Sequence, residues 1–175
     1  MKDVDEQFRV DEDGYTSDGY RRLEPVSKKS MYLGNVIVLA ILAAVLALIA
    51  MNADRWFAEN ADFVSIACWA LIIVSAAYLL VSPEVKYRRY RYRIDDDKLE
   101  IRRGVITIVH EMVPVERIHQ VDVSKGPINR MFGLADVTVT TAGGIVTLEY
   151  LQEDVAEDVA SKLNESVVLM LKERE

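Results

Sequence analysis

The chain has 175 residues with a formal net charge of −7, and its single cysteine, Cys68, excludes an intramolecular disulfide framework or a multi-cysteine metal cluster. An acidic chain of this kind also lacks the basic footprint that nucleic-acid binding requires, so no nucleic-acid partner is expected. Hydrophobic residues make up 51% of the chain and concentrate between Met31 and Val81, whereas the charged residues lie on either side. The composition therefore predicts a membrane segment joined to an acidic soluble segment.

Residues 1–30 are polar, with acidic residues early in the stretch and basic residues later. No apolar period of 2 or 3.6 residues holds there. A segment with so few apolar residues cannot bury enough surface to offset the entropy lost on ordering. We therefore expect residues 1–30 to form a disordered acidic tail.

Two uncharged, apolar stretches follow, over residues 31–51 and 63–81. As helices, both are long enough for a hydrocarbon layer of about 30 Å. A cleaved signal peptide would have a shorter apolar run and would not follow so long a polar tail. Pro83 is expected to end the second helix, because proline cannot continue the hydrogen-bond ladder. The sequence thus predicts a two-helix transmembrane hairpin within residues 31–82.

Basic residues predict the orientation of this hairpin. They flank it on both sides, as Arg21, Arg22, Lys28 and Lys29 before it and Lys86, Arg88, Arg89, Arg91 and Arg93 after it. The connecting loop carries only Arg55 against three acidic residues. By the positive-inside rule, the loop is expected outside and both termini in the cytoplasm. The expected location is the cell membrane, as a multi-pass protein whose cytosolic domain spans residues 86–175.

Strand-like alternation of apolar and polar residues marks residues 89–94, 99–102, 105–113 and 137–150. Between them, Ile118 and Val121 fall on opposite parities, which predicts a bulge near His119 and Gln120 because a strand must keep one face buried. Residues 127–132 predict one helical turn, and the adjacent glycines 143 and 144 predict a hairpin turn.

From Leu151 to Val167 an apolar residue recurs every four positions, which is typical of an amphipathic helix. Together these elements predict an α+β domain after the transmembrane hairpin. It would be a bent antiparallel sheet or barrel of about seven strands, capped by a C-terminal helix.

Three motifs in this domain are similar to the bacterial pleckstrin-homology-like (PH-like) domain of the YdbS-like membrane proteins. They are PVERIHQV at residues 114–121, RMFGL at residues 130–134 and TAGG at residues 141–144. Two transmembrane helices precede the domain in those proteins too, and the resemblance covers residues 32–171. It implies a PH-like fold and a membrane location, with little chemistry. Some relatives occur beside a larger membrane protein with several such domains, which implies a complex.

Three arginines, Arg89, Arg91 and Arg93, are expected to share a strand face just below the membrane. That position suits contact with anionic lipid headgroups, although the same residues could serve only to fix the topology. The neighbouring loop, residues 95–97, consists of three aspartates that repel phosphate. Specific phosphoinositide binding is therefore not expected.

Only one combination resembles a metal site, His110 and His119 with Glu111 and Glu116 on adjacent expected strands, and the spacing motifs of known metal sites are absent. We expect no metal, no cofactor and no catalytic residue, and therefore no enzyme. Arg117 and Arg130 lie in the resemblance motifs, where each would form an ion pair within the domain or bind a partner's carboxylate. The ion pair is the favoured interpretation.

Five consecutive apolar residues, 167–171, extend beyond a single core-facing stripe of the C-terminal helix. Val168 and Leu169 are therefore expected to contact a partner in a homo-oligomer or in a hetero-oligomer with another membrane protein. The sequence predicts a membrane-anchored, non-catalytic PH-like interaction module within a membrane protein complex. The alternative is a membrane-surface sensor of anionic lipid.

Overall fold

The computed structural model describes residues 11, 14–95 and 97–172, except for the side chains of residues 166 and 169–172. The chain divides into two compact units, which are described separately. Residues 31–84 form one unit, and the residues on both sides of them, up to 30 and from 85 onward, form the other. We call them the hairpin unit and the sheet unit.

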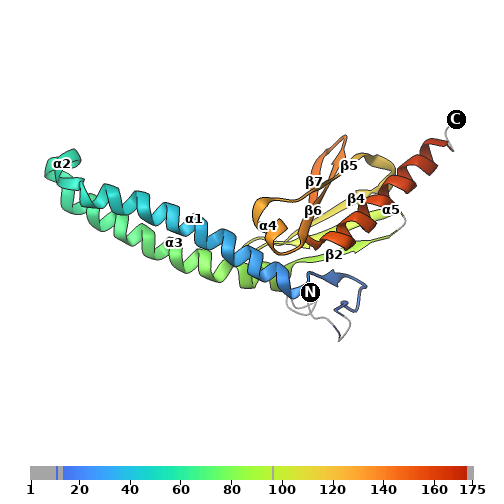
Figure 1. The fold of residues 1–175 in the computed structure, drawn as a ribbon, viewed down its shortest axis with the longest axis horizontal. Helices are drawn as coiled ribbons and strands as arrows, with labels where there is room; N and C mark the ends of the chain where they lie inside the picture. The colour runs from blue at the N-terminus through green and yellow to red at the C-terminus, as the bar shows by residue number, and fades with distance from the viewer. Residues whose placement is uncertain (1–10, 12–13, 96, 173–175) are drawn as a thin grey trace. The chain divides into compact units, whose positions relative to one another are not determined.

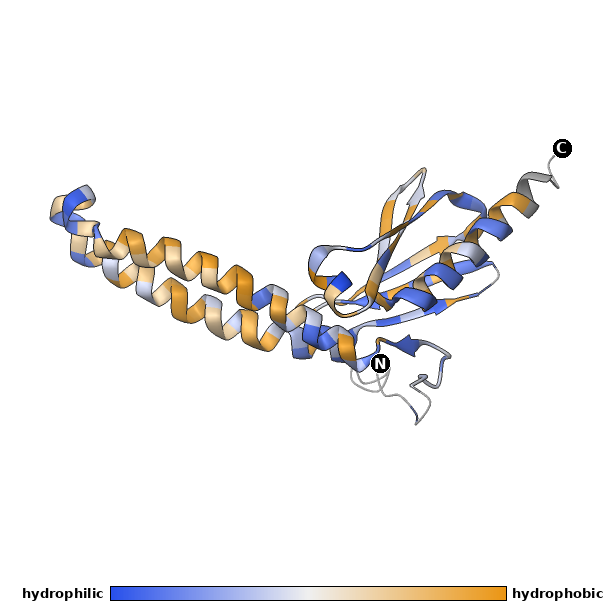
Figure 2. Cartoon of the chain, viewed as in Figure 1, coloured by the Kyte–Doolittle hydropathy of each residue, from blue (hydrophilic) through white to orange (hydrophobic). Residues whose placement is uncertain are grey.

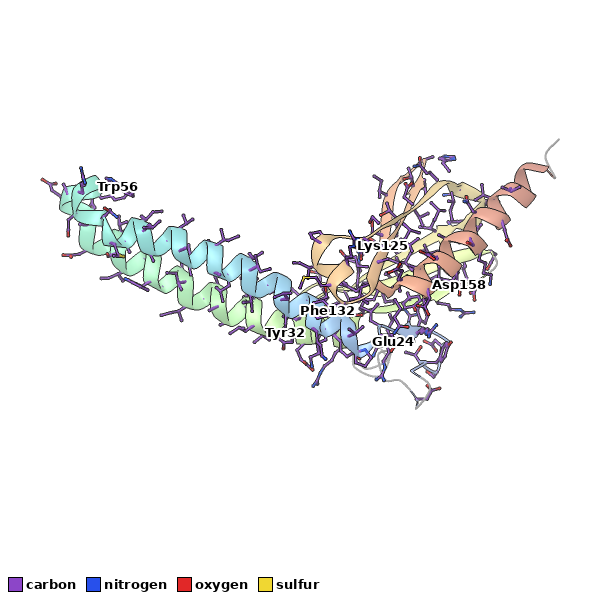
Figure 3. All side chains as sticks on the ribbon, in the orientation of Figure 1. Glu24, Tyr32, Trp56, Lys125, Phe132 and Asp158 are labelled. Carbon is purple, nitrogen blue, oxygen red and sulfur yellow. The ribbon has the colours of Figure 1, made fainter. Side chains whose placement is uncertain are left out.

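The hairpin unit contains most of two long helices, α1 (Pro25–Met51) and α3 (Ala61–Arg89), joined by the short helices α2 (Ala53–Phe57) and η2 (Ala58–Asn60). Apolar residues run along both long helices, and polar residues gather at the connection (Figure 2). Only 6% of the most apolar 18-residue stretch of each long helix is buried, whereas a core helix of a soluble protein would be mostly buried. Both are therefore candidate membrane spans, and Trp56 lies exposed in the connection between them (Figure 3).

Helix α3 continues through Pro83 to Arg89, so the expectation that Pro83 ends the helix is wrong. A proline inside a helix has no N–H to offer the carbonyl four residues earlier, which here belongs to Leu79. Asn35 on α1 supplies the missing donor, because its Nδ2 lies 2.7 Å from that carbonyl oxygen and 2.9 Å from Ser82 Oγ. The hairpin thus satisfies internally the backbone group that its proline frees.

The sheet unit contains two antiparallel sheets, whose strands are ordered β1-β2-β3-β4 and β5-β6-β7 (Figure 1). The strands are β1 (Arg21–Arg22), β2 (Arg91–Ile94), β3 (Lys98–Arg103), β4 (Val109–Pro114), β5 (Ile118–Ser124), β6 (Leu134–Thr141) and β7 (Gly144–Gln152). The short helix η3 (Val115–Arg117) connects the sheets, and α4 (Pro127–Met131) lies between β5 and β6. Helix α5 (Glu153–Lys172) packs against η3 and the second sheet. This architecture confirms the predicted fold class.

The core of the sheet unit follows from the alternation of the strands. Leu99 and Ile101 on β3, and Val137 and Val139 on β6, are fully buried because side chains two apart point to the same face. Helix α5 covers this core with Ala156, Val159 and Leu163, which recur at helical spacing and are likewise buried.

Three local predictions are confirmed. The register between β5 and β6 shifts between Ile118 and Gln120, where the parity change predicted a bulge. Thr141 and Gly144 close the hairpin between β6 and β7, and α4 forms the helical turn expected after the fifth strand.

Two local expectations differ from the structure. Residues 14–30 are not a tail, because β1 pairs with β2, Tyr20 and Leu23 are buried, and α1 already begins at Pro25. Residues 1–10, 12 and 13 lie outside the described residues. The strand expected to begin at residue 105 begins at Val109, because Gly104 turns the chain at a φ of +144° so tightly that a Cβ there would overlap the carbonyl oxygen of Thr107.

Candidate functional site

The three arginines expected to contact lipid do not share a strand face. Arg89 lies in the last turn of α3 and donates a hydrogen bond of 2.9 Å to a backbone carbonyl. Arg91 on β2 is only 4% exposed, because the segment 14–30 adds a strand beside it. Arg93 holds its Nε 2.9 Å from Asp95 Oδ2. Each guanidinium therefore makes contacts within the sheet unit, and headgroup contact by this trio stays a prediction.

Burial also changes the chemistry of Arg91. It lowers the pKa of this guanidinium from its ordinary value to about 10, and repulsion from Arg22 acts in the same direction. Its Nη1 donates a 2.7 Å hydrogen bond to the backbone oxygen of Tyr90. Arg91 thus lies within the protein rather than on the surface that a headgroup would meet.

A buried carboxylate on β3 anchors the segment 14–30. Glu100 accepts a hydrogen bond from the Tyr20 hydroxyl, and its carboxylate lies 2.7 Å from Lys98 Nζ and 3.2 Å from His110 Nε2. Burial alone would raise the pKa of Glu100, but the hydrogen bonds from these three side chains outweigh it. The pKa falls from 4.5 to about 2.

The ring of Tyr20 completes this anchor. The guanidinium carbon of Arg102 lies 3.8 Å from the centroid of this ring. The Nη1 atom of Arg102 also lies 3.6 Å from Asp18 Oδ2. Burial, followed by the hydrogen bond to Glu100, raises the pKa of Tyr20 to about 12. Sequence reasoning missed this cluster because Tyr20 and Glu100 are 80 positions apart. The only local signal was a tyrosine and a leucine in an otherwise polar stretch.

A second polar network shapes β7. Between Ala135 and Val137 the register with β7 shifts, and Tyr150 adopts a φ of +62°, which costs about 1–2 kcal/mol outside glycine. Asp136 offsets this strain by accepting a 2.8 Å hydrogen bond from the Tyr150 N–H, and Ser27 donates one of 2.8 Å to the Tyr150 carbonyl. The bulge interrupts the ladder between β6 and β7, which continues with the pairs Ala135–Leu151 and Leu134–Gln152.

The residues weighed as a metal site are not assembled into one. His110 lies on β4 in the Glu100 cluster, whereas His119 is an exposed residue of β5. Within the described residues, no group of three or more histidine, cysteine, aspartate or glutamate side chains is placed to hold a metal ion.

Arg117 and Arg130 are both exposed. Neither forms an ion pair with a residue that the structure describes, so the favoured expectation of ion pairs within the domain is wrong there. The structural reason is that the nearest strands direct their carboxylates elsewhere: Glu111, for example, pairs with Arg103 at 2.9 Å. Binding of a partner's carboxylate therefore remains the open alternative for both arginines.

A cavity of about 310 Å³ lies between β4 and the hairpin of β6 and β7. Its walls are residues 111–114 of β4 and residues 143–146 around the start of β7, with Arg117 and Thr141 completing the lining. Two of its apolar side chains are open to solvent, Met112 at 55% and Ile145 at 68%. Sequence reasoning missed the cavity because it depends on how two strands from different sheets are placed.

The predicted partner contact on α5 is only partly described. Val168 is exposed, at 47%, and the side chain of Leu169 lies outside the described residues. Elsewhere on this helix the exposed face is charged. Lys125, in the connection after β5, has its Nζ 2.5 Å from Glu153 Oε1 and 3.1 Å from Glu157 Oε1 in the first turns of α5. Contact of Val168 and Leu169 with a partner stays a prediction.

Comparison with known proteins finds similar chains. The profile of the bacterial PH domain family matches residues 29–167. The UPF0699 transmembrane protein YdbS of Bacillus subtilis (strain 168) is 24% identical over 98 residues, which are 56% of this chain and 60% of that protein. The UPF0699 transmembrane protein YdbT of the same organism is 28% identical over 90 residues, 51% of this chain and 18% of that protein. The chain thus matches less than two thirds of either relative, and no solved structure matches it.

Proposed function

Because this chain belongs to the bacterial PH domain family, we propose that it is a membrane-anchored, non-catalytic module that binds another protein within a membrane complex. Its two relatives are named as transmembrane proteins, and its own two apolar helices are candidate spans. Both support the membrane anchor. The part of the chain outside those spans would then supply the interaction.

The exposed apolar surface beside the cavity carries this proposal. Met112 and Ile145 both line the cavity, and their side chains are 55% and 68% exposed to solvent. These side chains belong to the sheet unit and not to the two candidate spans. Clustered apolar residues on a soluble surface mark sites of interaction with another molecule.

A photocrosslinking amino acid placed at Ile145 tests the proposal in the native host. The full-length protein is expected to form a discrete protein adduct when the probe replaces Ile145. The matched control replaces Asp158, which is also exposed but lies on the charged face of α5, and no adduct is expected there. If Ile145 yields only a phospholipid adduct, the interaction module is wrong and the alternative, a sensor of anionic lipid, is favoured.

We further infer that both termini lie in the cytoplasm, since the basic residues flank the hairpin and its connection is acidic. Single cysteines at Asn60 and Glu116, both exposed, test this in a Cys68→Ser background. An impermeant thiol reagent on intact cells is expected to label the Asn60→Cys variant alone. Labelling of Glu116→Cys alone would reverse the orientation.

A further inference from the structure

We propose that the cavity between β4 and the β6–β7 hairpin receives an extended segment of a partner protein, which pairs with the outer edge of β7 and places a carboxylate on Arg117. The inference deepens the proposed interaction function and rests on it. It assigns the binding mode and the chemistry of the bound segment. Three features of the sheet unit support it: an unpaired stretch of strand edge, an apolar wall and an unbalanced positive charge.

The outer edge of β7 is partly occupied. In an antiparallel sheet, alternate residues of an edge strand direct both N–H and C=O away from the neighbouring strand. On β7 two of these groups already have partners from other elements. Arg103 Nη1 donates to the Thr147 carbonyl at 3.3 Å, and the Glu149 N–H donates to the Tyr90 hydroxyl at 2.9 Å.

By the same alternation, Ile145 is the next residue of β7 whose backbone N–H and C=O point away from β6. Among the residues that the structure describes, no strand pairs with this edge, since β7 is bonded only to β6. Ile145 is also where the cavity begins, and its side chain is mostly exposed. The available backbone groups and the cavity therefore coincide at the start of β7, whereas the second half of the edge is closed by Arg103 and Tyr90.

The opposite wall of the cavity is apolar at three of its four residues, Glu111 being the exception. It is formed by four consecutive residues, 111–114, of β4, which in the described part of the chain pairs with β3 alone. Four residues of strand extend over about 13 Å. Met112 is flexible enough to pack on varied side chains, and Pro114 has no N–H to leave unsatisfied. An extended segment with apolar residues at alternate positions fits between this wall and the β7 edge.

Charge selects an acidic segment. Arg117 lines the cavity, is exposed, and has no ion-pair partner among the described residues. The carboxylate of Glu111 in the same lining is already neutralised by Arg103, at 2.9 Å. The cavity therefore presents one uncompensated guanidinium, whose planar fork suits a carboxylate.

Selection from a displayed library of random short peptides tests the proposal, with the full-length protein in mild detergent as the target. Enriched peptides are expected to alternate apolar and other residues and to carry aspartate or glutamate at one fixed position. Arg117→Gln should weaken the best peptide about tenfold, the effect of losing one charge-assisted pair. The matched control Arg55→Gln, an exposed arginine of the hairpin unit outside the cavity lining, should leave its affinity unchanged.

Two further measurements test the edge pairing itself. Ile145→Pro removes an outward N–H without touching the bonds to β6, and N-methylation removes the matching donor of the peptide. Each is expected to reduce binding at least tenfold. Equal binding by Ile145→Pro and the wild type, or enrichment of peptides without an acidic residue, would overturn the proposal.

Failure of this inference is distinct from failure of the interaction function. If no peptide is enriched although the probe at Ile145 crosslinks to a protein, docking of an extended segment is wrong and the interaction module stands. If an Ile145→Cys variant instead forms a disulfide-linked homodimer in a Cys68→Ser background, a second copy of this chain covers the cavity. The proposal of a partner segment is then also wrong.

Discussion

The hairpin unit and the sheet unit differ in how their backbone polar groups find hydrogen-bond partners. In the hairpin, the carbonyl freed by Pro83 accepts a hydrogen bond from Asn35, and Ser65 donates one of 3.0 Å to the carbonyl of Ala50. In the sheet unit, the edge of β7 is closed at Thr147 but open at Ile145. Lipid offers no hydrogen bonds, so a spanning segment must satisfy its backbone internally, whereas water can satisfy an open strand edge until a partner displaces it.

The first sheet shows how another segment of the same chain can pair with an exposed strand edge. There the segment 14–30 adds β1 to β2 and buries Tyr20 and Leu23. A closed edge contributes to stability, and an open edge is available for binding. Four substitutions test this difference, beginning with the one that should destabilise the protein most.

Leu23→Ala should open the closed edge. Leu23 is 1% exposed, and removing a buried leucine side chain costs about 2–5 kcal/mol. Hydrogen exchange of the full-length protein in detergent micelles should show faster exchange at residues 14–24 and along β2. The control Tyr15→Ala removes a partly exposed side chain of the same segment and should cost less than about 1 kcal/mol. Similar exchange in both variants would show that the segment does not stabilise the sheet.

Glu100→Gln should loosen the same segment and change its response to acid. Losing the charge-assisted hydrogen bonds of Glu100 should cost about 1–3 kcal/mol at neutral pH. Because the folded protein holds the pKa of Glu100 at about 2, below its ordinary 4.5, its contribution to stability is complete above pH 4.5. That contribution is lost progressively as the pH falls from 4.5 to about 2.

Thermal unfolding of the sheet unit, followed by circular dichroism of the full-length protein across this pH range, measures the effect. The difference between wild type and Glu100→Gln should shrink as the pH falls. The control Glu116→Gln removes an exposed carboxylate and should change the melting temperature little. A constant difference between wild type and Glu100→Gln would contradict the lowered pKa.

The sequence predicted those elements that depend on local pattern. The length of the apolar runs predicted two spans, and the parity change between Ile118 and Val121 predicted the bulge. It did not predict features that depend on distant partners. The buried Tyr20 bonds to Glu100 on a distant strand, and the carbonyl that Pro83 leaves free in α3 accepts a hydrogen bond from Asn35 on the neighbouring helix.

The candidate site shows the same limit. A resemblance motif contained Arg117, but the sequence could not show whether an acidic residue would reach it. The cavity arises between strands of two different sheets, so no spacing along the chain reveals it. The three arginines near the second span show the reverse case. Their alternation predicted a common exposed face, and the added strand β1 buries the middle one, Arg91.

Asn35→Leu tests whether the hydrogen bond from Asn35 to the carbonyl freed by Pro83 stabilises the hairpin unit. It removes the donor to the Leu79 carbonyl and should cost about 1 kcal/mol, which is typical of an interhelical hydrogen bond in a membrane. Both tryptophans, Trp56 and Trp69, lie in the hairpin unit, so tryptophan fluorescence during unfolding in a denaturing detergent reports on it.

A Pro83→Ala background provides the control for this experiment. Alanine restores the N–H that bonds the Leu79 carbonyl within the helix, so Asn35→Leu should lose most of its effect there. An equal loss of stability in both backgrounds would show that Asn35 does not compensate for the proline.

Ile145→Ala should have the smallest effect on stability, and it tests the open edge most directly. Its side chain is 68% exposed, so its removal should change the free energy of unfolding by less than about 0.5 kcal/mol. Leu148→Ala on the same strand removes a fully buried side chain and should cost about 2–5 kcal/mol. The apolar Ile145 side chain therefore does little for the folded state, although solvated apolar surface is unfavourable. Under the proposed binding role, Ile145→Ala should weaken the selected peptides while the melting temperature stays near that of the wild type. A large loss of stability would instead make Ile145 part of the core and remove its exposed side chain as support for the binding role.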